Sequence, residues 1–263
     1  MQHANSRGFR IHYEDVGDGA PVVLLNGYAS PAAEWTEVGY TDRLVGRYRV
    51  LAVDSLGHGE SDKTYDPSDY RFPDVAFDIV AAMDASGVER AALWGYSRGA
   101  KLAATVAAEV PDRVAALVLG GFWPPSESTE EQIDPSTEAL MRGDWDAYWE
   151  IVLRDEAISA EDRRYMQESS DPRAMAAVSL GTMRSDYSID ASRITAPTLL
   201  YYGSEDASDP DLGPAIAAFG VPHVLEGRHD HFSAFTDVAS VAPVVLGFLE
   251  SEYTTNQAGT GTS

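Results

Sequence analysis

The sequence contains no cysteine, and only two of its 263 residues, Lys63 and Lys101, are lysines. Without a thiol, the chain can form no disulfide, no thiolate nucleophile and no cysteine-based zinc or iron–sulfur site. Its 42 acidic residues outnumber 19 basic ones, which gives a net charge of −23. Because such a charge repels polyanions, we expect neither nucleic acid nor an anionic membrane surface as a partner.

Long apolar runs are also absent. No segment approaches the roughly 18 apolar residues of a membrane-spanning helix, and residues 1–7 lack the apolar stretch of a signal peptide. We therefore expect a cytoplasmic protein that acts on a small molecule. A homo-oligomer is compatible with the sequence, which does not set the oligomeric state.

Short apolar runs alternate with amphipathic segments along most of the chain. The runs predict strands over residues 9–14, 22–26, 49–54, 91–96, 115–119, 198–202 and 221–225. Helices are predicted over 35–47, 73–86, 98–109, 211–219 and 232–251. Strands that are apolar throughout, with helices between them, predict an α/β fold with a mostly parallel sheet covered on both faces.

One segment breaks this alternation. Residues 126–195 contain no convincing strand, and helices are predicted there over about 136–154, 160–168 and 172–184. We interpret 126–195 as a helical cap inserted into a core domain made of 1–125 and 196–253. The small, polar tail over 254–263 is predicted to be disordered.

The pentapeptide Gly95-Tyr96-Ser97-Arg98-Gly99 matches G-x-S-x-G between a predicted strand and a predicted helix. A strand that turns directly into a helix crowds its own backbone, which explains the two glycines. The turn exposes the serine at the carboxyl end of the sheet, and it points the first N–H groups of the helix at whatever the serine attacks.

A serine nucleophile needs a base and an acid that orients the base. His229 and His231 follow the last predicted strand, and Asp206 follows the strand before it, all at the same edge of the sheet. The chain order Ser97, Asp206, His231 is the order typical of this architecture. His229 remains a rival base, and a metal pair of His229 and His231 is disfavoured because no third ligand stands at a recognisable spacing.

The oxyanion hole needs two backbone donors. We assign them to the N–H of Arg98 and to the N–H of Tyr28, which follows Asn26-Gly27 after an early strand. Aromatic residues near this edge predict a hydrophobic substrate pocket. Its candidate substrate-binding residues are Tyr28, Tyr96, Trp123, Trp145 and Trp149.

These motifs together resemble the α/β-hydrolase fold, in particular small bacterial esterases, enol-lactone hydrolases and cofactor-free haloperoxidases. The matching pieces are Asn26-Gly27-Tyr28, Asp54 to Asp62, Gly95 to Gly99, Gly203 to Asp206 and Asp230-His231-Phe232. The chain departs from that family's pattern in two places. Asn26 stands where a histidine usually precedes the oxyanion glycine, and His231 follows Gly227 by four residues where three are usual.

We therefore expect a serine hydrolase that cleaves a small carboxylic ester or lactone through an acyl-enzyme, with no cofactor and no metal. The same triad could instead serve perhydrolysis, carbon–carbon bond hydrolysis or cyanohydrin cleavage. Epoxide hydrolases and haloalkane dehalogenases are disfavoured because they carry Asp at the nucleophile position. A ligand receptor that keeps the fold without turnover is the alternative from another class.

Overall fold

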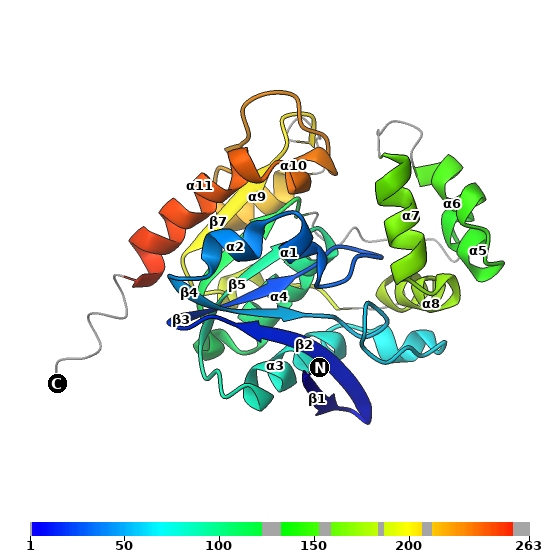
Figure 1. Cartoon of the computed structure of the whole chain (residues 1–263), viewed down its shortest axis with the longest axis horizontal. Coiled ribbons are helices and arrows are strands. Elements are labelled where there is room, and N and C mark those ends of the chain that lie inside the picture. The colour runs from blue at the N-terminus through cyan, green and yellow to red at the C-terminus, as the bar shows by residue number, and fades with distance from the viewer. Residues whose placement is uncertain (1, 123–132, 153–158, 184–186, 207–211, 255–263) are drawn as a thin grey trace.

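A single eight-stranded sheet organises the protein. The computed structural model describes residues 2–122, 133–152, 159–183, 187–206 and 212–254 (Figure 1). The strands lie in the order β1-β2-β4-β3-β5-β6-β7-β8, and only β1 and β2 pair antiparallel to their neighbours. Their bounds are Gln2–Ser6 (β1), Phe9–Val16 (β2), Ala20–Leu25 (β3), Tyr48–Val53 (β4), Ala91–Tyr96 (β5), Val114–Gly120 (β6), Thr198–Tyr202 (β7) and His223–Val224 (β8). The predicted α/β class with a mostly parallel sheet is confirmed.

Helices cover both faces of this sheet. The helices between strands, or after the last strand, are Glu34–Glu37 (α1), Tyr40–Leu44 (α2), Asp74–Ala85 (α3), Arg98–Glu109 (α4), Gly213–Phe219 (α9), Ser233–Thr236 (α10) and Val238–Phe248 (α11). Short 3-10 turns occupy Pro67–Tyr70, Pro111–Arg113 and Ala191–Arg193, and a π-helical turn occupies Leu249–Thr254. In the part of the chain that the structure describes, no helix is long and apolar enough to cross a membrane.

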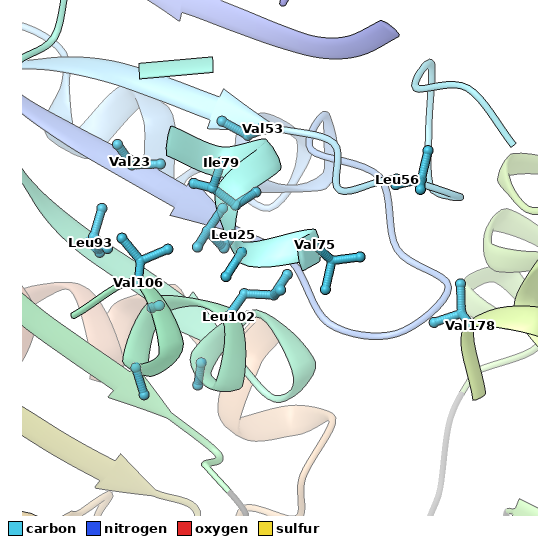
Figure 2. Close-up of a cluster of buried hydrophobic side chains, with 14 of the residues drawn as sticks. Val23, Leu25, Val53, Leu56, Val75, Ile79, Leu93, Leu102, Val106 and Val178 are labelled. Carbon is cyan, nitrogen blue, oxygen red and sulfur yellow. The ribbon is translucent and has the colours of Figure 1, made fainter. Parts of the chain in front are cut away.

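The period of two along each strand divides the core into two layers. Val23 and Leu25 of β3 face α3 and α4, where Figure 2 shows Ile79, Leu102 and Val106 packed around them. Their neighbours Val22 and Leu24 belong to the opposite layer, with side chains of α1, α2 and α11. Because both faces of the central strands are buried, β3, β5 and β6 contain no charged residue, which is why short apolar runs predicted them well.

Four helices lie together beside the sheet (Figure 1). They are Pro135–Met141 (α5), Trp145–Val152 (α6), Ala160–Ser169 (α7) and Pro172–Met183 (α8). The expected helices over 160–168 and 172–184 match α7 and α8, whereas the expected helix over 136–154 is two helices. Gly143, at φ +73°, lies between α5 and α6 and ends the first of them. The division of the chain into a core domain and a cap stays a prediction.

Three other predicted elements are wrong in extent. The helix expected over 35–47 is α1 and α2, separated by Gly39 at φ +99°. The helix expected over 232–251 breaks at Asp237, whose carboxylate accepts from Ser240 N and begins α11. The strand expected over 221–225 has only two residues, β8. Strand β1 was not expected at all, and the tail lies outside the described residues from 255 onward.

At the amino end of α4, the main chain of the helix packs directly against the main chain of β3 and β5. A Cβ placed on Gly99 would lie 2.0 Å from the carbonyl oxygen of Leu25, and one on Gly95 would lie 2.2 Å from that of Gly99. Real Cβ atoms do not approach backbone oxygen so closely, so only glycine allows this packing. Since the obstacle is main chain rather than a flexible side chain, it cannot rotate away.

We therefore expect Gly99→Ala to lower the free energy of unfolding by about 3 kcal/mol through overpacking. The matched control is Gly247→Ala in α11, where an added Cβ meets no atom within 4 Å. That substitution should raise the free energy of unfolding by about 0.5–1 kcal/mol, because alanine favours the helix. Urea denaturation measures both, and similar effects of the two substitutions would contradict this account of the turn.

Candidate active site

Ser97 lies on the sharp turn between β5 and α4. Its backbone has φ 54° and ψ −117°, a conformation that costs a non-glycine residue about 1–3 kcal/mol. The turn is fixed from outside, because Ser97 N donates to the carbonyl oxygen of Gly120 over 2.8 Å. Gly27 lies on the other side, where a Cβ would be 3.5 Å from Ser97 Cβ. Neighbouring strand ends thus hold this strained serine in place.

Asp206 and His231 form a hydrogen-bonded pair. Asp206 lies four residues beyond the end of β7, His231 directly precedes Phe232 and α10, and His231 Nδ1 is 3.2 Å from Asp206 Oδ2. Both side chains are largely buried, with 18% of His231 and 9% of Asp206 exposed. The carboxylate therefore engages one ring nitrogen and leaves Nε2 of His231 for other partners.

The same cavity is lined by Ser97 and His231. It has a volume of about 190 Å³, and Gly27, Tyr28 and Tyr96 also line it. Tyr96 joins the two elements, because it precedes Ser97 and its hydroxyl donates to the carbonyl oxygen of His231 over 2.6 Å. No hydrogen bond links Ser97 Oγ to His231 within the described residues. Such contacts are often long without substrate.

His229 has a different environment. Its Nε2 is 2.9 Å from Asp237 Oδ2, and Asp237 is the residue that begins α11. His229 is buried and is not among the described residues that line the cavity. The structure thus pairs each histidine with its own carboxylate, and only His231 borders the space next to Ser97.

The loop after β3 carries the other expected donor. Tyr28 lines the cavity, and neither its N–H nor that of Arg98 donates to another described residue. The Tyr28 hydroxyl donates to the carbonyl oxygen of Met175 in α8 over 2.6 Å. Asn26, where the resembled family has histidine, is buried and donates from Nδ2 to Glu34 Oε2 over 3.1 Å. The change of residue thus redirects hydrogen bonding behind the loop.

The guanidinium of Arg98 lies behind the turn. It is buried, donates from Nη1 to Ser55 Oγ over 3.2 Å, and lies 5.9 Å from the centre of the Phe72 ring. Burial lowers the pKa of Arg98 to about 10, so the side chain remains charged at neutral pH. Arg98 is not among the described residues that line the cavity, which leaves only its backbone N–H as a possible contribution there.

The predicted aromatic residues have different locations. Tyr28, Tyr96 and Trp149 line the cavity, whereas Trp145 packs on Trp149 at 5.9 Å between ring centres and is not among the lining residues described. Trp123 lies outside the described residues. Tyr148, Phe232 and Phe235 also line the cavity, although the sequence analysis did not assign them to it.

Comparison with known proteins agrees with this architecture. The family model for the alpha/beta hydrolase fold matches residues 20–163. A protein of Variovorax paradoxus named "Putative carbamate hydrolase RutD" is 32% identical over 91% of this chain and 96% of its own. The chain belongs to the alpha/beta hydrolase family.

Solved structures share the fold of this alpha/beta hydrolase at lower identity. The enol-lactonase of Burkholderia xenovorans LB400 superposes with a TM-score of 0.79 and 21% identity, over 95% of this chain and 100% of that one. The bromoperoxidase of Bacillus anthracis has a TM-score of 0.78 and 20% identity, over 95% and 99% of the two chains. At these identities the likeness concerns the fold alone.

The cavity of this alpha/beta hydrolase also contains a carboxyl group that the sequence analysis missed. Glu34 opens α1, lines the cavity with Ser30, and stands eight residues after Asn26 in the loop that follows β3. Burial is the main cause that raises the pKa of Glu34 to about 7, and the nearby carboxylate of Asp162 also raises it. Hydrogen bonds from Ser30 and Asn26 act in the opposite direction and lower this pKa. The signal for this residue was its place shortly after the carboxyl end of β3, at the edge of the sheet where Ser97 also lies.

A metal site is not apparent at this edge. Among the residues that the structure describes, no three His, Asp or Glu side chains are grouped so as to hold an ion.

The raised pKa of Glu34 predicts a specific dependence of stability on pH. Between the ordinary value of 4.5 and about 7 the folded state holds a proton that the unfolded state has lost. The contribution of this group to stability is therefore greatest below pH 4.5 and falls as the pH rises to 7. Glu34→Gln should remove that fall, so the variant should gain about 1–2 kcal/mol relative to the original protein between pH 5 and pH 8.

Urea denaturation at the two pH values measures this difference, and contributions from other groups cancel. Glu37→Gln, at an exposed position of the same helix, is the control. Glu37 raises the pKa of Glu34 less than Asp162 does, so this variant should differ from the original protein far less than Glu34→Gln does. A Glu34→Gln variant that followed the original protein just as closely would contradict the raised pKa of the Glu34 carboxyl.

Proposed function

We propose that this alpha/beta hydrolase cleaves a small carboxylic ester or lactone through an acyl-enzyme on Ser97. One observation carries the proposal: the strained Ser97 borders the same cavity as His231, whose Nδ1 is hydrogen-bonded to Asp206. A serine hydroxyl becomes an effective nucleophile when a base accepts its proton and a carboxylate orients that base.

The reaction follows from these roles. His231 accepts the proton of Ser97 as the oxygen attacks the substrate carbonyl, and Asp206 stabilises the positively charged imidazole. The N–H groups of Tyr28 and Arg98 donate to the oxyanion of the tetrahedral intermediate. His231 then gives the proton to the leaving alcohol, and it later activates the water that releases the acid.

The cavity and the relatives both support a small acyl substrate. A volume of about 190 Å³ is close to the roughly 150 Å³ of an engineered cavity that binds benzene, so we expect an acyl group about the size of one ring. The enol-lactonase shares the fold, and the relative from Variovorax paradoxus is named for hydrolysis of a carbamate, another acyl compound. A panel of short acyl esters and lactones of graded size would identify the preferred substrate.

We expect Ser97→Ala to lower kcat on a short 4-nitrophenyl ester by about 10⁴-fold, with no loss of fold by circular dichroism. A fluorophosphonate should label Ser97 in the original protein, as peptide mass spectrometry would detect. A ligand receptor on the same fold would show neither the burst of nitrophenol nor the label, and a Ser97→Ala variant with near-original turnover would end the proposal.

The two histidines give a second, matched test. His231→Gln should lower kcat by about 10³-fold or more, whereas His229→Gln, which retains a donor for Asp237, should remain within about threefold. The opposite pattern would transfer the role of base to His229.

A further inference from the structure

The charges around the cavity are unbalanced. Two carboxyl groups line it, Glu34 from α1 and Asp162 from the first turn of α7. They are near enough for Asp162 to disfavour the ionised form of Glu34. No lysine or arginine is among the described lining residues, and His231 is already paired with Asp206. A ligand in this cavity therefore meets two carboxyl groups whose negative charge, when they are ionised, no cation among the described lining residues offsets.

The neutral part of the lining is aromatic. Tyr96, Tyr148, Trp149, Phe232 and Phe235 all border the cavity. The face of an aromatic ring attracts cations through its quadrupole, by about 0.5–2 kcal/mol per contact. The aromatic side chains and the two carboxyl groups, which come from different elements, are thus both suited to a cationic ligand.

The hydrogen bonds of Glu34 fix its side chain at the cavity. Asn26 Nδ2 donates to Glu34 Oε2 over 3.1 Å, and Asn26 is itself buried between β3 and the loop next to Ser97. Asp162 is oriented from its own helix, where Ser159 Oγ donates to Asp162 Oδ2 over 2.7 Å. The two groups thus come from different elements, Glu34 from α1 and Asp162 from α7.

We propose that Glu34 is a specificity-determining residue that selects, for the reaction at Ser97, substrates carrying an organic ammonium group. The proposal deepens the proposed function and rests on it for the reaction, whereas recognition of the cation rests on the cavity alone. Binding of the cation replaces the proton of Glu34 as the partner of its carboxylate. The net charge of −23 acts in the same direction, because it raises the local concentration of cations around the molecule.

Binding without chemistry tests the cation site. Choline and its uncharged isostere 3,3-dimethylbutan-1-ol are titrated calorimetrically at pH 8 and physiological ionic strength, where the distant surface charges are screened within about 8 Å. We expect choline to bind at least tenfold more tightly than the alcohol. In Glu34→Gln the ratio should fall to within about threefold of unity, and in Asp162→Asn it should fall partway.

The control variant is Glu37→Gln, which removes the same charge from the same helix at an exposed position outside the cavity lining. It should keep the ratio of the original protein. Equal affinity for choline and the alcohol in the original protein, or equal loss in Glu34→Gln and Glu37→Gln, would overturn the proposal.

Turnover separates this proposal from the proposed function. Acetylcholine and 3,3-dimethylbutyl acetate place the cation on the alcohol side, and the ethyl esters of 4-(trimethylammonio)butanoic and 5,5-dimethylhexanoic acid place it on the acyl side. We expect kcat/KM to favour the charged member of at least one pair tenfold, and this ratio to fall in Glu34→Gln. Hydrolysis that needs Ser97 but shows no preference in either pair overturns the cation specificity and keeps the proposed function. Preferential binding of choline without hydrolysis of any ester overturns the proposed function and keeps the recognition of the cation.

Discussion

The close approach of backbone to backbone at the start of α4 is the constraint on which the site depends. Because Gly95 and Gly99 have no side chain, the first turn of α4 can pack directly on β3 and β5. In this arrangement Ser97, which lies between the two glycines, adopts a strained conformation at the edge of the sheet. Burial of the apolar layers on both faces of the sheet offsets the free-energy cost of that strain and holds the strands and α4 in place. The position of the serine thus follows from main-chain sterics rather than from any side chain.

A buried carboxylate has a comparable role among the loops. Asp54, directly after β4, accepts from the N–H groups of Ala32 and Glu60 and lies 2.8 Å from His12 Nδ1. This single side chain ties together the loop that leads to Glu34, the loop over residues 55–62 and strand β2. Its hydrogen bond with His12 raises the pKa of that imidazole, so the charged form persists to higher pH than in a free histidine. The position of the loop that leads to Glu34 in the cavity lining therefore depends on the hydrogen bonds of Asp54, which lies outside the described lining.

Most strands and the long helices could be predicted from the sequence, because buried parallel strands leave an unmistakable apolar run and G-x-S-x-G marks a strand-to-helix turn. Other elements could not. Strand β1 is edge structure defined by its partner β2, and the breaks at Gly39 and Asp237 interrupt segments whose apolar spacing continues through them. Glu34 was missed for a similar reason: an acidic residue beside Trp35 is typical of a solvated helix end, and only the tertiary arrangement places it in the lining of the cavity that Ser97 borders. The separate carboxylate partners of His229 and His231 likewise depend on where distant loops meet.

The loop after β3 is fastened to the helices above it by two contacts. Besides the bond from Tyr28 to Met175, Ser170 Oγ donates to the carbonyl oxygen of Ala29 over 2.9 Å. The segment to which we assign an oxyanion donor is therefore hydrogen-bonded to the residue that follows α7 and to the first turn of α8. A movement that lifted these helices to admit a bulky molecule would drag the donor away from Ser97. For the proposed reaction, a bulky ligand that separated α7 and α8 from this loop would thus have to break both hydrogen bonds.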